Sequence, residues 1–232
     1  MSLEFVPHEH PEWKNKHSFW SPSSHRLDKK DWENWSDAEI LEYIISTLRK
    51  DKATDIGTII HAEAAWNIER RLRIKNKSIA FYDIQKALMK ADIPEAIINP
   101  AEFAETYMAY VNDGVGYNMY TEVQVGTGDA AFGSIDAMSF DYKTKFLRIH
   151  DLKTGTTPTK IEQLIAYAAY ICLEYKFKPG EIKSELRIYQ SGEIISYEPT
   201  ASDLLTYMER IRRGSDIFQR VVGHGLIAGR KK

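Results

Sequence analysis

The sequence has almost no cysteine, no excess of basic charge and no long apolar run. Cys172 is the one cysteine in 232 residues, so no disulfide can form within the chain, which is typical of a reducing compartment such as the cytoplasm. No apolar stretch approaches the roughly 20 residues that cross a bilayer. The start, residues 1–13, lacks the cationic and apolar regions of a signal peptide. We therefore expect a cytoplasmic protein without a membrane partner.

The charge balance argues against one class of ligand. The chain has 31 Lys and Arg against 33 Asp and Glu, a formal net charge of −2. Proteins that bind nucleic acid without sequence preference usually carry a basic surface, so basic residues would have to gather locally. The densest basic run lies at 70–77 and contains Arg70, Arg71 and Arg73. This run is either a solvated helix face or a set of phosphate contacts along a nucleic-acid track.

The first half of the chain is predicted to be helical. Residues 1–20 lack periodicity and are expected to form an extended arm, with Ser21-Pro22 starting a helix after it. Four tryptophans of this region would either anchor the arm or stack on bases: Trp13, Trp20, Trp32 and Trp35. Apolar spacing predicts helices over 36–49, 55–73, 82–91 and 100–112, with the apolar stripe of the second at Ile60, Ala64, Ile68 and Leu72. Residues 113–116 are expected to end the helical part.

From Asn118 the apolar period changes to two, which predicts strands. An antiparallel meander is expected over 118–125, 131–140 and 145–153, with its first turn at 126–129. The remaining elements are a helix at 159–177, strands at 183–190 and 193–197, and a last helix at 201–222. The 159–177 helix would pack on the sheet through Leu164, Ala168, Ile171 and Tyr175.

This order of elements predicts one α/β domain with a mixed central β-sheet flanked by helices. The domain covers residues 1–232, with an arm at 1–20, a helical part at 21–113, an α/β core at 118–200, and a C-terminal helix and tail at 201–232.

Two carboxylates and a lysine are predicted to share one face of the meander. If Phe140 lies opposite Lys145, Asp136 is diagonal to Asp151, roughly 7–8 Å away between Cα atoms. Alternation places Lys153 on that face and Leu152 on the other. Buried carboxylates without a partner are costly, and two of them form the oxygen-rich site that Mg²⁺ prefers. Lys153 would hold or deprotonate a water molecule beside the cation.

An acidic residue two positions before a lysine recurs elsewhere, for example at Asp141 and Lys143, so the triplet alone says little. The surrounding residues distinguish Asp151 and Lys153. Four groups share the chain order of a site: Gly57 to His61 at a helix, Glu122 in a strand, Gly133 to Asp136, and Gln163 with Tyr167 at helical spacing. Alone, His61 is typical of a buried core histidine; together with the two aspartates it is interpreted as a ligand.

These residues form the series GxxxH, strand Glu, GxxD, DxK and QxxxY, which resembles the RecB-like branch of the PD-(D/E)xK nuclease superfamily over residues 55–190. The resemblance implies a restriction-endonuclease-like core and one or two Mg²⁺ or Mn²⁺ ions on His61, Asp136 and Asp151, assisted by the Leu152 carbonyl. Lys153 would be the catalytic lysine, Glu122 would support the site, and Gln163 and Tyr167 would position nucleic acid. An imidazole ligand favours Mn²⁺. A single cysteine excludes the four-cysteine iron–sulfur cluster of some relatives.

Standalone proteins of this branch and size are often DNA exonucleases, including viral ones. The resemblance therefore implies a DNase acting on single-stranded or resected ends in replication, recombination or repair, in a bacterial or phage-infected cell, alongside replication or recombination proteins. A structure-specific endonuclease is the nearest alternative. A binding or assembly module that keeps the fold without turnover is another, and a purely structural α/β protein is a third. None of the expected site residues is missing, which favours the nuclease.

Overall fold

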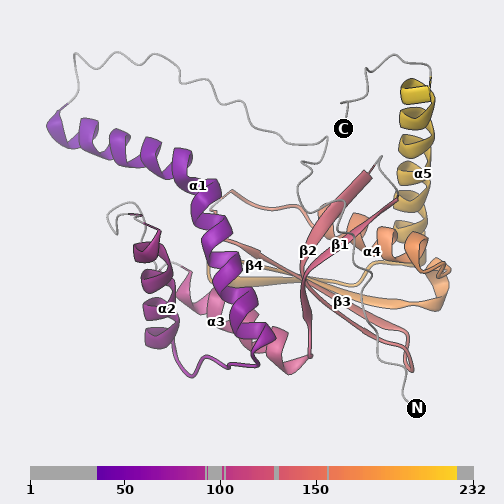
Figure 1. Cartoon of the computed structure of the whole chain (residues 1–232), viewed down its shortest axis with the longest axis horizontal. Coiled ribbons are helices and arrows are strands. Elements are labelled where there is room, and N and C mark those ends of the chain that lie inside the picture. The colour runs from indigo at the N-terminus through magenta and orange to yellow at the C-terminus, as the bar shows by residue number, and fades with distance from the viewer. Residues whose placement is uncertain are drawn as a thin grey trace.

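A five-stranded mixed β-sheet lies between two groups of helices (Figure 1). Its strands follow the chain order and are β1 (Tyr120–Thr127), β2 (Ala131–Asp141), β3 (Phe146–Lys153), β4 (Lys183–Gln190) and β5 (Glu193–Tyr197). The first three strands form an antiparallel meander, β4 pairs parallel with β3, and β5 pairs antiparallel with β4. The predicted α/β class and the mixed sheet with flanking helices are confirmed.

The computed structural model describes residues 36–91, 93, 101, 103–127, 131–155 and 157–223. Several predictions fall outside these ranges: the arm at 1–20, the helix start at Ser21-Pro22, the four tryptophans between Trp13 and Trp35, and the tail from His224. The end of the predicted 126–129 turn also lies outside them, whereas Gly126 and Thr127 belong to β1.

The helices cover the two faces of the sheet separately (Figure 1). One face carries α1 (Asp37–Glu69), α2 (Lys77–Lys90) and α3 (Ala104–Gly116); the other carries α4 (Glu162–Glu174), a short 3₁₀ turn η4 (Pro179–Glu181) and α5 (Ala201–Gly223). Each side has its own apolar cluster. The predicted stripe of the 159–177 helix is confirmed for Leu164, Ala168 and Ile171, which are buried, whereas Tyr175 is only partly buried. Among the described residues, no helix has the length and apolarity needed to cross a membrane.

The two helices predicted over 36–49 and 55–73 are one helix, α1. The residues between the two predicted helices include no Gly or Pro, and Lys and Ala propagate a helix well. The helix therefore continues although its apolar pattern is interrupted there. The helix ends earlier than predicted because Arg71 adopts a left-handed φ of 59°. The Leu72 N–H then donates back to the Asn67 carbonyl (2.9 Å). Leu72 is consequently 44% exposed, and its predicted place in the buried stripe is wrong.

The helix predicted over 100–112 continues through Gly116 as α3, so the helical part ends within the predicted 113–116 segment. Gly114 serves close packing there. A Cβ built on Gly114 would lie 2.6 Å from Cδ1 of Ile68, which is fully buried in α1. The two helices therefore approach as closely as they do because this residue has no side chain.

Replacing Gly114 with alanine is expected to destabilise the protein by about 1–3 kcal/mol through overpacking against Ile68. This cost exceeds the roughly 1 kcal/mol that alanine gains over glycine in a helix. Gly214→Ala in α5 is the matched control, because a Cβ there meets nothing within 4 Å and should stabilise. Urea denaturation of both variants measures the difference, and equal midpoints would contradict the packing role of Gly114.

The register of the β2–β3 hairpin differs from the prediction by two residues. Phe140 lies opposite Leu147, not Lys145. Lys145 has a left-handed φ of 52° and belongs to the turn. The Asp141 carboxylate also shapes this turn, because it accepts hydrogen bonds from the Lys143 N–H (2.8 Å) and the Thr144 hydroxyl (2.8 Å). The longer turn moves Asp136 from a diagonal position to one directly opposite Asp151.

Candidate metal centre

Three carboxylates lie in a row across β1, β2 and β3. The pairs on either side of Glu122 are Thr121 with Ala137 and Val123 with Ile135, so Glu122 is level with Asp136. The β2–β3 register, continued by one residue beyond the Ala137–His150 pair, brings Asp136 level with Asp151. Neighbouring positions in a sheet are about 4.5–5.5 Å apart, so the two registers together concentrate negative charge at one place.

The strands are distorted at this row. Glu122 has a φ of 51°, in the left-handed region that costs a non-glycine residue about 1–3 kcal/mol. In β2, Ile135 and Met138 pack in the α4-side cluster although they are three residues apart, while Ala137 packs on the α1 side. Regular alternation would place Ile135 and Met138 on opposite faces. The pleat therefore changes phase at Asp136, which a period-two pattern does not reveal.

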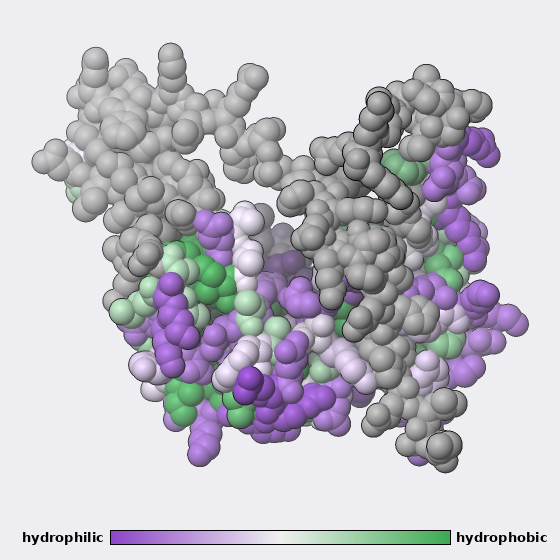
Figure 2. All heavy atoms as spheres, viewed as in Figure 1, coloured by the Kyte–Doolittle hydropathy of each residue, from purple (hydrophilic) through white to green (hydrophobic). Residues whose placement is uncertain are grey.

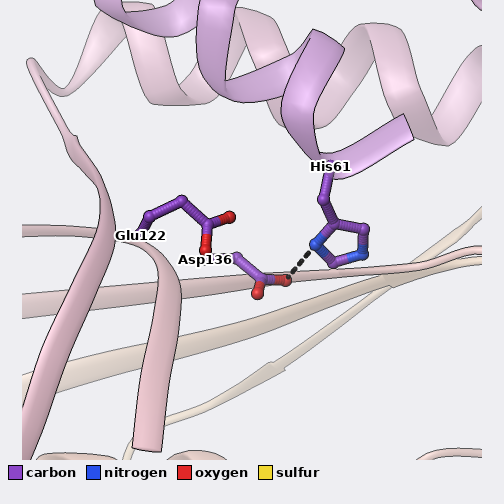
Figure 3. Close-up of side chains that lie close together, drawn as sticks. All are labelled: His61, Glu122 and Asp136. Carbon is purple, nitrogen blue, oxygen red and sulfur yellow. Dashed lines mark ion pairs between the residues drawn. The ribbon is translucent and has the colours of Figure 1, made fainter. Parts of the chain in front are cut away.

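His61 reaches this row from α1. Its Nδ1 lies 3.3 Å from Asp136 Oδ2 (Figure 3). One ligand atom each from His61, Glu122 and Asp136 lie within 4.8 Å of one another. The Leu152 N–H donates to the same Asp136 oxygen at 3.0 Å and so fixes its direction. The structure thus brings together the predicted residues His61 and Asp136. It also brings Glu122, which the resemblance gives a supporting role, to within 4.8 Å of the ligand atoms of His61 and Asp136.

Asp151 and Lys153 form an ion pair beside the cluster. Lys153 Nζ lies 3.0 Å from Asp151 Oδ2 and is the charge partner of this buried oxygen, which has no further hydrogen-bond partner among the described residues. Asp151 is 3% exposed, whereas the Lys153 side chain is 27% exposed. Leu152 points away into the α1-side cluster, as predicted. A buried carboxylate with an incompletely satisfied oxygen is suited to a cation.

Burial and mutual repulsion hold protons on this centre. Burial first, and then the charge of Asp136, raises the pKa of Asp151 to about 7, against the opposing charge of Lys153. The same two causes raise the pKa of Glu122, although its side chain keeps contact with solvent. Burial lowers the pKa of His61, but the hydrogen bond and charge of Asp136, together with the other carboxylates, outweigh it and raise that pKa. A divalent cation would displace these protons.

Without metal, the stability of the protein is expected to fall as the pH rises from about 4 to about 7. Asp151 holds its proton in the folded state up to about pH 7 but ionises near pH 4 when unfolded. The folded state therefore binds more protons in that window, and stability decreases by at most about 1.4 kcal/mol per pH unit. Melting temperatures in EDTA measure this. Asp151→Asn should flatten the profile and be more stable than wild type above pH 7; an unchanged profile would contradict the protonated Asp151.

The predicted pair on α4 lies beside the centre. Gln163 Nε2 donates to the Tyr167 hydroxyl at 2.8 Å. The Tyr167 ring packs on Gly133, where a Cβ would lie 2.7 Å from Cε1. Burial, and more weakly the charges of Asp151 and Asp136, raise the pKa of Tyr167 to about 12, so it remains a neutral hydroxyl. On α1, a Cβ on Gly57 would lie 3.5 Å from Thr154 Oγ1, next to Lys153.

Gln190 is a site residue that sequence reasoning missed. It is level with Lys153 in the parallel β3–β4 pair and is 8% exposed. Its Nε2 donates to the carbonyls of Gly155 (2.6 Å) and Thr157 (2.8 Å), and its Oε1 accepts from the Thr159 N–H (3.2 Å). One amide therefore fastens the loop from Lys153 to α4. A glutamine that directly follows the apolar pair Ile188 and Tyr189 at the buried end of a strand is the signal that identifies it.

A buried polar network supports the opposite side of β3. The Tyr189 hydroxyl donates to Asp113 Oδ2 (2.6 Å) and lies 3.1 Å from His150 Nδ1. Arg187 pairs with the same aspartate at 2.8 Å. Burial, and then the charges of Arg187 and Arg148, lower the pKa of His150 to about 3. This histidine is therefore neutral throughout the physiological range and adds no charge behind Asp151.

The predicted phosphate contacts lie beyond the end of α1. Arg70 stacks over the Trp66 ring at 4.7 Å. Arg71 Nη1 donates to the Met119 carbonyl at 3.5 Å, and Arg73 lies near Gly116. None of these contacts is with the cluster of His61, Glu122 and Asp136, so the basic run forms a separate region on the same helical side of the sheet.

Comparison with known proteins does not establish a family. No protein-family model matches the sequence, and no curated protein is similar to it. Among solved structures, the chain is similar to the protein SSO0001 with 14% sequence identity and a TM-score of 0.31, over 78% of this chain and 87% of that one. A likeness at this level carries no argument about fold or function. The function must be argued from the site.

Proposed function

We propose that this protein is a metal-dependent nuclease with a restriction-endonuclease-like core, which hydrolyses phosphodiester bonds of DNA. The observation that carries the proposal is the meeting of His61 with a row of three carboxylates next to Lys153. These residues come from α1 and three strands, and a structural role does not require them to converge. The β1–β2–β3 meander followed by a helical crossover to a parallel β4 supports the fold part of the proposal.

The donor set suits Mg²⁺ or Mn²⁺. The carboxylates of Glu122, Asp136 and Asp151 are hard oxygen donors, and the His61 imidazole favours Mn²⁺ of the two. His61, Asp136 and Asp151, with the Leu152 carbonyl and Glu122, would hold one or two ions. When bound, the metal would supply Lewis-acid chemistry, neutralising charge on the phosphate and polarising its oxygens.

Residues of the chain would orient the water, hold the metal ligands in place and position the substrate. Lys153 is half-open to solvent and is held by Asp151, so its ammonium can orient the attacking water and stabilise charge that develops on the phosphate. Asp136 holds His61 and is itself held by the Leu152 N–H, which keeps the donors arranged before substrate arrives. The hydroxyl of Tyr167 and the amide of Gln163 lie where they can orient the substrate.

Digestion of end-labelled linear DNA and circular DNA, each single- and double-stranded, tests the proposal with Mg²⁺ or Mn²⁺ present. We expect loss of linear single strands or resected ends and survival of circles, as an exonuclease requires. Cleavage of circles would replace this with the endonuclease alternative. In parallel, Mn²⁺ should raise the melting temperature of wild type and have little effect on His61→Ala. No cleavage and no stabilisation by metal would overturn the proposal.

Tyr167→Phe and Gln163→Ala are expected to cleave at least about tenfold more slowly, a loss of roughly 1.4 kcal/mol of transition-state stabilisation. The reason is lost orientation, because each change breaks the 2.8 Å bond between the two side chains while leaving the metal ligands intact. Single-turnover rates and Mn²⁺-dependent melting curves measure the two effects separately. Tyr170→Phe, on the same helix, is the matched control. Wild-type rates in both variants would show that Gln163 and Tyr167 do not orient the substrate and serve only in packing.

A further inference from the structure

A groove between α1 and α2 has no part in the metal centre. The two helices and the link at 72–74 enclose about 770 Å³. Apolar residues dominate its walls: Ile59, Ala62, Trp66, Leu72, Ile74 and Ile79. Three of them are substantially exposed, Trp66 at 45%, Leu72 at 44% and Ile79 at 39%. Figure 2 shows apolar side chains between these helices, bordered by hydrophilic ones.

The charge around the groove is opposite in sign to that of the whole chain. Arg73, Lys86 and Lys90 line it, and Arg70 lies over the Trp66 ring at 4.7 Å. Two carboxylates, Glu63 and Asp83, also line it. Four cations against two carboxylates leave a local excess of positive charge in a chain whose net charge is −2. The complementary ligand is therefore an anion with apolar surface.

The two carboxylates lie among the cations of the groove, since the charges of Lys86 and Lys90 act on Glu63 and that of Lys86 acts on Asp83. Burial, and then the charge of Asp83, raises the pKa of Glu63. Burial also raises the pKa of Asp83. A Glu or Asp carboxylate can accept a hydrogen bond from the amino edge of a base, as from cytosine N4. Apolar walls, an exposed indole and surrounding cations together match bases joined by phosphates.

We infer that this groove binds single-stranded nucleic acid, with a base stacked on Trp66 and phosphates on Arg73 and Lys90. A duplex keeps its bases stacked on one another and offers Trp66 no face, whereas a single strand does. The inference rests on the proposed function, because it supplies that nuclease with its substrate class. Trp66 follows His61 by five residues, about 7.5 Å along the axis of α1 and about 140° around it, so the groove and the metal centre lie on different faces of the same helix.

Binding measured without metal tests the groove independently of cleavage. The probe is a fluorescein-labelled oligothymidylate of about twelve nucleotides, followed by anisotropy in EDTA, with an unlabelled duplex of equal length as competitor. Trp66→Ala should weaken binding about tenfold. Trp66→Phe retains an aromatic face and should lie within about threefold of wild type. Arg73→Ala should weaken binding and lower the slope of log affinity against log salt by about 0.7.

Tyr142→Ala is the control, since Tyr142 is 40% exposed in the turn between β2 and β3, away from the groove. It should bind as wild type does, and melting temperatures confirm that each variant folds. Wild-type affinity in Trp66→Ala, preference for the duplex, or no binding by wild type would each overturn the inference. If Trp66→Ala binds normally while wild type cleaves DNA with Mn²⁺, the proposed binding groove is rejected and the proposed nuclease activity is retained. If binding depends on Trp66 but no cleavage occurs, the groove is retained and the nuclease activity is rejected.

Discussion

Replacing Lys153 with alanine is expected to reduce cleavage by at least about a thousandfold while the protein still folds. The ammonium lies 3.0 Å from Asp151 Oδ2, at the end of the carboxylate row. Without it, the attacking water loses the side chain proposed to orient it, and the metal alone is left to stabilise the charge that develops on the phosphate. Single-turnover cleavage of a labelled strand measures the loss.

Metal binding by Lys153→Ala should persist. Its charge lowers the pKa of Asp151, so the variant holds the Asp151 proton to higher pH. The Mn²⁺-dependent melting shift should therefore be compared with wild type over a range of pH, and the variant should need a higher pH than wild type for the same shift. Lys143→Ala is the matched control, because Lys143 also follows an aspartate by two residues but lies in an exposed turn. Near-normal turnover in Lys153→Ala would remove its assigned role.

Changing Asp136 is expected to abolish both cleavage and stabilisation by metal. Asp136 contacts His61, accepts from the Leu152 N–H and lies between Glu122 and Asp151 in the row. Asp136→Asn keeps an oxygen for the Leu152 N–H but loses the charge, whereas Asp136→Ala loses both. We expect activity to fall at least about a thousandfold in each variant.

The two Asp136 variants separate charge from structure. In EDTA, Asp136→Asn should melt at or above the wild-type temperature, because it removes repulsion with Asp151 and Glu122. Neither variant should respond to Mn²⁺ by calorimetry or by thermal shift. Asp216→Asn in α5, an exposed aspartate far along the chain, is the control. A wild-type response to Mn²⁺ in Asp136→Asn would exclude the proposed ligand set.

Local periodicity was sufficient to predict the strands. The strands at 183–190 and 193–197 have the predicted bounds, because alternation between turn residues defines an element well. Asp136, Asp151 and Lys153 lie together because each is fixed by its strand and a short hairpin. His61 joins them although alone it resembles a core histidine, which shows that grouped motifs carry more information than single residues.

Other features depend on backbone conformations that no periodicity specifies. Lys145 and Arg71 have a left-handed φ although neither is glycine. Because of Lys145 the β2–β3 register differs from the prediction, and because of Arg71 the helix α1 ends earlier than predicted. The phase change at Asp136 depends in the same way on Glu122. Gly114 caused the opposite error, because a helix was predicted to end before it. This glycine instead lies within α3, where it allows close packing against Ile68. Tertiary contacts decided each case.

The contacts of Gln190 determine when, during synthesis of the chain, the loop after β3 can be held in place. A nascent chain that has emerged only as far as α4 already contains every proposed ligand, Lys153 and the α4 pair. It lacks β4, so β3 is still an unprotected edge, and the three backbone groups of the 155–159 loop have no amide to bind them. Because 35 residues separate Gln190 from Gly155, this loop can be fixed only after the chain has been synthesised through β4.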